Sequence, residues 1–82
     1  MMFSKALTFG GHTRTFRVDS VSARGWEVQV VQDSDVVRRT WYSDWHRVER
    51  AISAIEREVL ALEAQGWRVL PEPPSTGQST NL

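Results

Sequence analysis

The stretch TWYSDWHRVERA, residues 40–51, holds two tryptophans, a tyrosine, a histidine and two arginines within twelve positions. Side chains of these types can stack on bases, bind phosphates or transfer protons. As a general base, His46 would need an orienting carboxylate, and Asp44 is the nearest one in the sequence. Residues two apart on a helix do not face each other, however, and we find no matched nucleophile to complete a triad. We therefore predict no catalytic residue and interpret this stretch as the joint where a strand becomes a helix.

Five side chains from the expected strands form the best candidate for a binding surface. Arg17 and Arg38 would grip a phosphate backbone, and the ring of Tyr42 would offer a surface for stacking. Asp19 and Glu27 would share this surface and repel phosphates, so a solvated sheet face or a contact with a second copy is the competing interpretation. The candidate interaction face consists of Arg17, Val31, Arg38, Thr40 and Tyr42.

A helix over roughly residues 44–65 must position the joint, because apolar residues recur there at spacings of three and four. Ser43 or Asp44 would cap its amino end. Gly66 suits the left-handed position after the last turn, and a Schellman motif would then place Trp67 against Leu62. The apolar stripe consists of Trp45, Val48, Ile52, Ile55, Val59 and Leu62.

Upstream of the helix the apolar period changes to two, which is typical of strands. The segments TFRVDS, WEVQVV and VVRRTWY predict three strands, with a further strand over 6–9 and a short extended piece over 68–70. We therefore predict a two-layer α+β fold in the order β-β-β-α. Its antiparallel meander sheet has three or four strands, and the helix packs on one face.

The loop lengths decide which side chains share a face of the sheet. We expect a three-residue first loop at 23–25 and a two-residue second loop at 34–35. This choice places Trp41 under the helix and leaves Arg38 and Tyr42 on the uncovered face. A three-residue second loop would exchange Tyr42 for Trp41 and bury Arg38, and we prefer the first register because it buries more apolar area. The expected strand core is Phe16, Val18, Trp26, Val28, Val30, Val37 and Trp41.

The composition limits the classes of function. Ten basic and ten acidic residues cancel, so no overall field attracts nucleic acid or an anionic membrane. The chain has no cysteine and only two histidines, so we expect neither a metal site nor a cofactor. A domain of 82 residues without disulfides or metals needs either a good core or self-association for its stability, and the second would make it a homodimer.

The absence of cysteine and of any signal-like or membrane-spanning apolar run favours a cytoplasmic protein without membrane contact. We expect residues 1–70 to form one domain. The last twelve residues, 71–82, contain three prolines and little to bury, which predicts a disordered tail.

Residues 25–67 resemble a pattern found in small bacterial proteins of unknown function. The shared features are a Gly-Trp-Glu-Val strand, a hairpin, an aromatic-Ser/Thr-Asp-Trp-His helix start and a closing Gly-Trp. This resemblance implies a fold and no activity. In layout alone the chain is similar to the WGR domain, a strand-rich module ending in one helix that contacts DNA in some poly-ADP-ribose polymerases. The defining Trp-Gly-Arg is absent and RGWE at 24–27 has a different order, so no functional residue of that family carries over.

Together these features predict a non-catalytic interaction module that self-associates. The alternative is a nucleic-acid-binding module that uses the uncovered face of the sheet. Both hypotheses place the contact on the sheet beside the aromatic joint, and neither identifies a biological partner.

Overall fold

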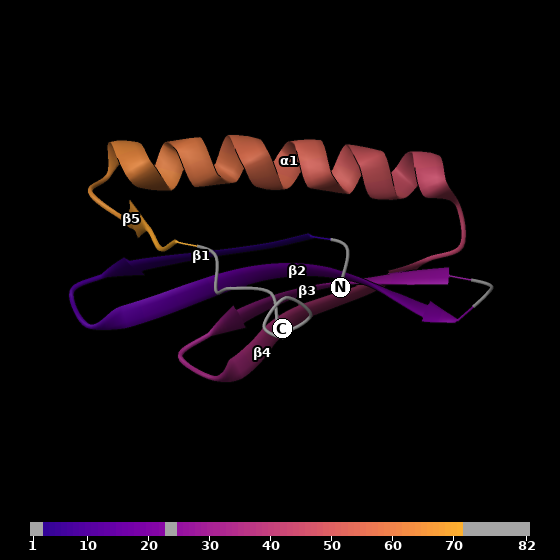
Figure 1. Ribbon diagram of the computed structural model, residues 1–82, viewed down its shortest axis with the longest axis horizontal. Coiled ribbons are helices and arrows are strands. Elements are labelled where there is room, and N and C mark those ends of the chain that lie inside the picture. The colour runs from indigo at the N-terminus through magenta and orange to yellow at the C-terminus, as the bar shows by residue number, and fades with distance from the viewer. Residues whose placement is uncertain (1–2, 23–24, 72–82) are drawn as a thin grey trace, which may run out of the picture.

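The computed structural model describes residues 3–22 and 25–71 of the chain. Its five strands form one antiparallel sheet in the order β4-β3-β2-β1-β5, and α1 lies along one side of it (Figure 1). This arrangement confirms the predicted α+β fold. The elements are β1 (Phe3–Phe9), β2 (His12–Ser22), β3 (Gly25–Gln32), β4 (Asp35–Tyr42), α1 (Trp45–Ala64) and β5 (Arg68–Val69). The predicted tail at 71–82, apart from Pro71, and most of the first predicted loop lie outside the described residues.

The strand expected at 6–9 exists and is longer than predicted, because β1 begins at Phe3. Gly10 and Gly11 connect it to β2 with φ angles of 58° and 83°, a backbone that glycine adopts without steric cost. Leu7 is fully buried in this strand, although its sequence context did not place it in the core. The short β5 pairs with β1 at Leu7 and Thr8 and extends the sheet on that side.

The helix begins and ends at the predicted signals. Asp44 is the N-cap, and its Oδ1 accepts a hydrogen bond from the backbone N–H of His46 at 2.9 Å. At the other end Trp67 N–H donates to the Leu62 carbonyl at 3.0 Å, while Gly66 has a φ of 108°. These contacts are those of a Schellman motif, as the sequence predicts.

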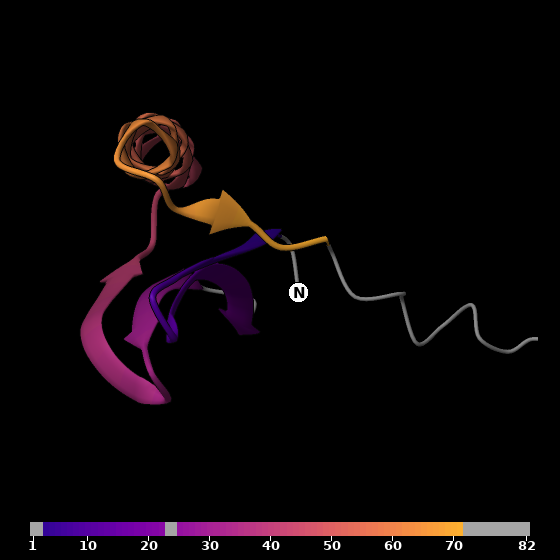
Figure 2. The same ribbon diagram turned by 90° about the vertical axis from the view of Figure 1, so that its left-hand side faces the viewer.

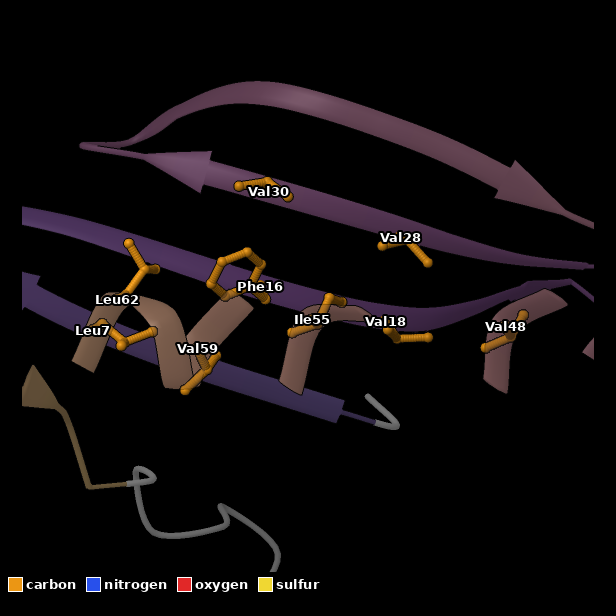
Figure 3. Close-up of a cluster of buried hydrophobic side chains, with 9 residues drawn as sticks. All are labelled: Leu7, Phe16, Val18, Val28, Val30, Val48, Ile55, Val59 and Leu62. Carbon is orange, nitrogen blue, oxygen red and sulfur yellow. The ribbon is translucent and has the colours of Figure 1, made fainter. Parts of the chain in front are cut away.

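The hydrophobic core lies between α1 and the facing side chains of β1, β2 and β3. Figure 3 shows Ile55 and Val59 of the helix close to Val18 and Phe16 of β2. In the view along the helix axis, α1 lies on one side of strands that curl strongly (Figure 2). The buried apolar residues are Leu7, Phe16, Val18, Val28, Val30, Val48, Ile55, Val59 and Leu62.

The second hairpin differs from the prediction in where its turn lies. The turn has two residues, as expected, but they are Asp33 and Ser34, with φ angles of 50° and 76°. Gln32 therefore pairs with Asp35. Because a shift of a two-residue turn by one position preserves which side chains share a face, this difference alone would not have exchanged the faces.

A β-bulge in β4 exchanges the faces. Val31 pairs with Val36, but Val30, the residue before Val31, pairs with Arg38. Val37 is therefore the extra residue of the bulge. The predicted burial of Val37 and Trp41 is therefore wrong, since they are 57% and 52% exposed. Tyr42 pairs with Trp26 and packs against the core in place of Trp41. This is the outcome of the alternative register, reached through a bulge rather than through a longer loop.

Asp33 ties the two hairpin turns together at one end of the sheet. Its carboxylate accepts a hydrogen bond from Thr13 N–H at 2.8 Å and lies 2.8 Å from His12 Nδ1. Its own N–H donates to the Thr13 carbonyl at 2.8 Å. These hydrogen bonds, first from the Thr13 backbone and then from His12, lower the pKa of Asp33 below its ordinary value of 3.8.

The lowered pKa of Asp33 predicts that Asp33→Asn destabilises the protein at neutral pH and not in acid. A carboxylate with a lowered pKa in the folded state contributes stability above its unfolded pKa, and this contribution is lost as pH falls through the folded pKa. Asparagine tolerates the left-handed backbone and keeps an acceptor for Thr13, so the substitution removes mainly the charge. Thermal unfolding should show a gap between wild type and Asp33→Asn at pH 7 that closes below pH 3.8. A gap of constant size across this range would contradict the prediction.

Candidate interaction surface

The structure divides the candidate interaction face between two sides of the sheet. We call the side turned away from α1 the open face. Arg17 and Val31 lie on the open face, as predicted, because they alternate with the buried Phe16 and Val30. The others lie on the helix side, because they pair with inward-facing residues of β3. These displaced residues are Arg38, Thr40 and Tyr42.

On the helix side, Arg38 lies within ion-pair distance of α1. Its Nη2 lies 3.7 Å from Oε1 of Glu58, and Nη1 of Arg14 lies 3.5 Å from Oε2 of the same carboxylate. The Arg14 guanidinium also donates to Gln32 at 2.8 Å and lies 5.7 Å from the centre of the Trp67 ring. Because these ion pairs are partly exposed, each contributes little to stability by itself. They place a carboxylate beside Arg38, the arginine that the sequence assigned to phosphate binding, and this carboxylate would repel a phosphate.

The aromatic joint has mainly a structural role. The ring centres of Trp45, at the helix start, and Trp26, on β3, are 5.3 Å apart, which fixes the corner between strand and helix. Tyr42 packs against the same core, and Thr40 is half-buried beside Val28. Trp41 alone among the aromatic residues of the joint lies on the open face, opposite Glu27.

A polar row crosses the open face from β1 to β4. The register aligns Ser4, Arg17, Gln29 and Arg39. Arg39 Nε lies 2.9 Å from Oε2 of Glu27, and Gln29 donates to Oε1 of the same side chain at 3.2 Å. Arg39 was not predicted as an open-face residue, because the register expected from the sequence turns the side chain between Val37 and Trp41 toward the helix.

Trp41 lies directly against the backbone of Gly25. A Cβ atom at Gly25 would be 2.3 Å from Cζ2 of the indole and 2.9 Å from the Tyr42 carbonyl oxygen, so only glycine fits beneath the ring. The other side of the ring stays accessible, which makes Trp41 a half-exposed aromatic platform beside Arg39. The only signal for this contact in the sequence was the position of Gly25, two residues before Glu27, which is the strand partner of Trp41.

The outer strand β4 is the least covered part of the sheet. It pairs with β3 on one side, and no strand within residues 3–22 and 25–71 pairs with its other edge. Val36, Val37 and Trp41 are all about half-exposed on this strand. An unpaired edge of eight residues with exposed apolar side chains is a template for pairing with another chain.

Other parts of the described structure give no catalytic or metal-binding arrangement. His46 lines a shallow hollow together with Glu49, Arg50 and Arg57, but every lining residue belongs to α1, so no second element closes this hollow. Within the described ranges no three acidic or histidine side chains group as metal ligands would. Nor is any described helix both long and apolar enough to cross a bilayer.

No protein-family model, curated protein or solved structure matches this chain. The resemblance to small bacterial proteins of unknown function therefore stays a prediction. Two surfaces of the described residues are candidates for binding a partner, the open face and the outer edge of β4.

Proposed function

We propose that this protein is a non-catalytic interaction module whose outer strand β4 binds a second copy of the chain. The observation that carries the proposal is the outer edge of β4, which no strand of the described residues pairs with, together with the exposed apolar side chains Val36, Val37 and Trp41. A strand that joins such an edge gains a row of backbone hydrogen bonds and covers apolar surface at the same time. A second copy is the simplest occupant, because it supplies an identical free edge.

Two features of β4 restrict what can pair with it. The bulge at Val37 interrupts the regular edge, and Arg38 and Arg39 place two adjacent positive charges on it. Bulges and charged side chains are the usual devices by which edge strands avoid indiscriminate pairing. The strand is therefore suited to a specific contact rather than to open-ended aggregation.

Sedimentation equilibrium across the micromolar range tests the proposal. We expect wild type to dimerise, and Val37→Lys to raise the dissociation constant by about tenfold because it adds a third cation to each β4 edge. Val21→Lys is the matched control, because Val21 on β2 is 52% exposed and adds the same charge away from β4. A wild-type protein that stays monomeric would overturn the proposal, and equal effects of the two variants would move the contact away from β4.

The alternative function, nucleic-acid binding on the open face, has weaker support. In its favour, Arg17, Arg39 and the half-exposed ring of Trp41 share this face. Against it, Arg39 is already paired with Glu27 at 2.9 Å, and Arg38 and Tyr42 lie on the helix side. A labelled single-stranded oligonucleotide added to the same sedimentation runs at low salt distinguishes the two functions, because only the alternative predicts co-sedimentation.

A further inference from the structure

We propose that two copies of β4 pair antiparallel about a two-fold axis that passes through Thr40. This inference rests on the proposed self-association and specifies its register. In this arrangement Arg39 lies opposite the partner's Trp41 on the open face. On the helix side, Arg38 lies opposite the partner's Tyr42. The two sheets then continue into one, with both helices on the same side.

The alternation of side chains limits the possible registers. Antiparallel strands of two identical chains in one sheet are related by a two-fold axis perpendicular to the sheet, so each face of one copy adjoins the same face of the other. Arg39 and Trp41 belong to the open face, whereas Arg38, Thr40 and Tyr42 belong to the helix side. An open-face residue must therefore lie opposite another open-face residue. This requirement places the axis at a residue rather than between two residues.

Electrostatic repulsion, the end of β4 and the bulge each exclude some of the neighbouring registers. An axis at Arg38 or Arg39 would set that arginine directly opposite itself, and like charges in opposed positions destabilise a sheet. An axis at Trp41 would pair only the end of the strand, because β4 ends at Tyr42. An axis at Val36 or Val37 would fall on the bulge, where the pairing is irregular. Thr40 is the remaining position, and its small hydroxyl side chain can face its own copy.

At this register the opposed side chains are complementary. An arginine beside the face of an indole or phenol ring is a favourable cation–π pair, and two kinds of such pair would form in duplicate. Each arginine also keeps a carboxylate of its own chain nearby, Glu27 for Arg39 at 2.9 Å and Glu58 for Arg38 at 3.7 Å. The positive charge that two adjacent β4 strands bring together is thereby offset. Both arginines and Trp41 are more than half exposed in the single chain, so the partner's rings can reach the guanidinium groups while their ion pairs with Glu58 and Glu27 are kept.

Cysteine cross-linking in the full chain tests the register, because the natural sequence contains no cysteine. Residues opposed to their own copies on antiparallel strands have Cα atoms about 4.5–5.5 Å apart, a separation within the range that a disulfide spans. We expect Thr40→Cys to form a disulfide-linked dimer under mild oxidation at least about tenfold faster than Arg38→Cys, Arg39→Cys or Trp41→Cys. An equimolar mixture of Arg39→Cys and Trp41→Cys should cross-link faster than either variant alone, because these positions oppose each other.

The two arginine variants are controls that make the competing registers more favourable. Slow cross-linking of these variants therefore counts against those registers. Arg38→Cys and Arg39→Cys each remove the charge that would oppose an axis at that residue. Circular dichroism and sedimentation of reduced Thr40→Cys should match wild type. Fast cross-linking at another position, or slow cross-linking at all four in a protein that still dimerises, would overturn the register and leave self-association standing. A monomeric wild type would remove both.

Discussion

Phe16→Ala is expected to cost about 3–5 kcal/mol of the free energy of unfolding. Phe16 is fully buried in β2, with β1 and β3 paired on either side and Val59 and Ile55 of the helix close by (Figure 3). Its truncation leaves a cavity that the four packed elements β1, β2, β3 and α1 cannot easily fill. A domain of this length has roughly 4–12 kcal/mol of stability in total. The variant should therefore lose a large fraction of its stability, with a urea midpoint well below that of wild type.

Phe9→Ala is the matched control for this core substitution. Phe9 lies at the end of β1 and is 49% exposed, with its ring centre 5.6 Å from that of Trp67. We expect it to cost about 1 kcal/mol, because less apolar area leaves water and the site is open to solvent. Urea unfolding monitored by circular dichroism compares the two variants without depending on tryptophan fluorescence. Equal costs would contradict the described arrangement of β1, β2 and the helix.

The helix could be predicted from sequence because its signals are local. The cap at Asp44, the apolar stripe and the stop at Gly66 each act within a few residues of chain, so no knowledge of the partner layer is needed. The shared face of β2 and β3 was predictable for a similar reason, because Phe16 and Val18 alternate regularly opposite Val30 and Val28. The loop between these strands was not, since Gly25, expected in the loop, is the first residue of β3 and pairs with Ser22 beyond a register shift.

The faces of β4 could not be predicted because one extra residue decides them. Val36 and Val37 are both strong strand formers, so the sequence does not show which of them the bulge contains. The choice depends on contacts far along the chain. Trp41 fits against Gly25, Tyr42 packs against the core, and Arg38 reaches Glu58 on the helix. These tertiary contacts outweigh the greater apolar burial that the expected register offered to Trp41.

The same single residue determines the candidate site. Arg17 and Val31 lie on β2 and β3, before the bulge, and keep their predicted face. Every residue of β4 after Val37 changes sides, which removes Arg38 and Tyr42 from the open face and brings Arg39 and Trp41 to it. The proposed contact between two β4 strands depends on this exchange, because the exchange places Trp41 beside Arg39 on the open face.

Gly25→Ala provides the most direct test of this exchange and should cost about 1–3 kcal/mol. The added Cβ would lie 2.3 Å from Cζ2 and 2.6 Å from Cε2 of Trp41, as well as 2.9 Å from the Tyr42 carbonyl oxygen. The indole is half-exposed and can move away, but the carbonyl belongs to the strand backbone and cannot. Urea unfolding should therefore show a loss of stability, and the emission of Trp41 should change as its ring leaves the glycine.

A double-mutant cycle with Trp41→Ala separates the two contacts. In the Trp41→Ala background, Gly25→Ala should cost less than in wild type, with a coupling of about 0.5 kcal/mol or more, because the ring no longer meets the added methyl group. The remaining cost measures the contact with the Tyr42 carbonyl. Gly10→Ala is the control: an added Cβ there has no heavy atom within 4 Å, so its cost comes from the positive φ alone and should not couple to Trp41. If Gly25→Ala and Trp41→Ala are additive, the indole does not contact Gly25, and the described position of Trp41 on the surface proposed to bind the second chain is contradicted.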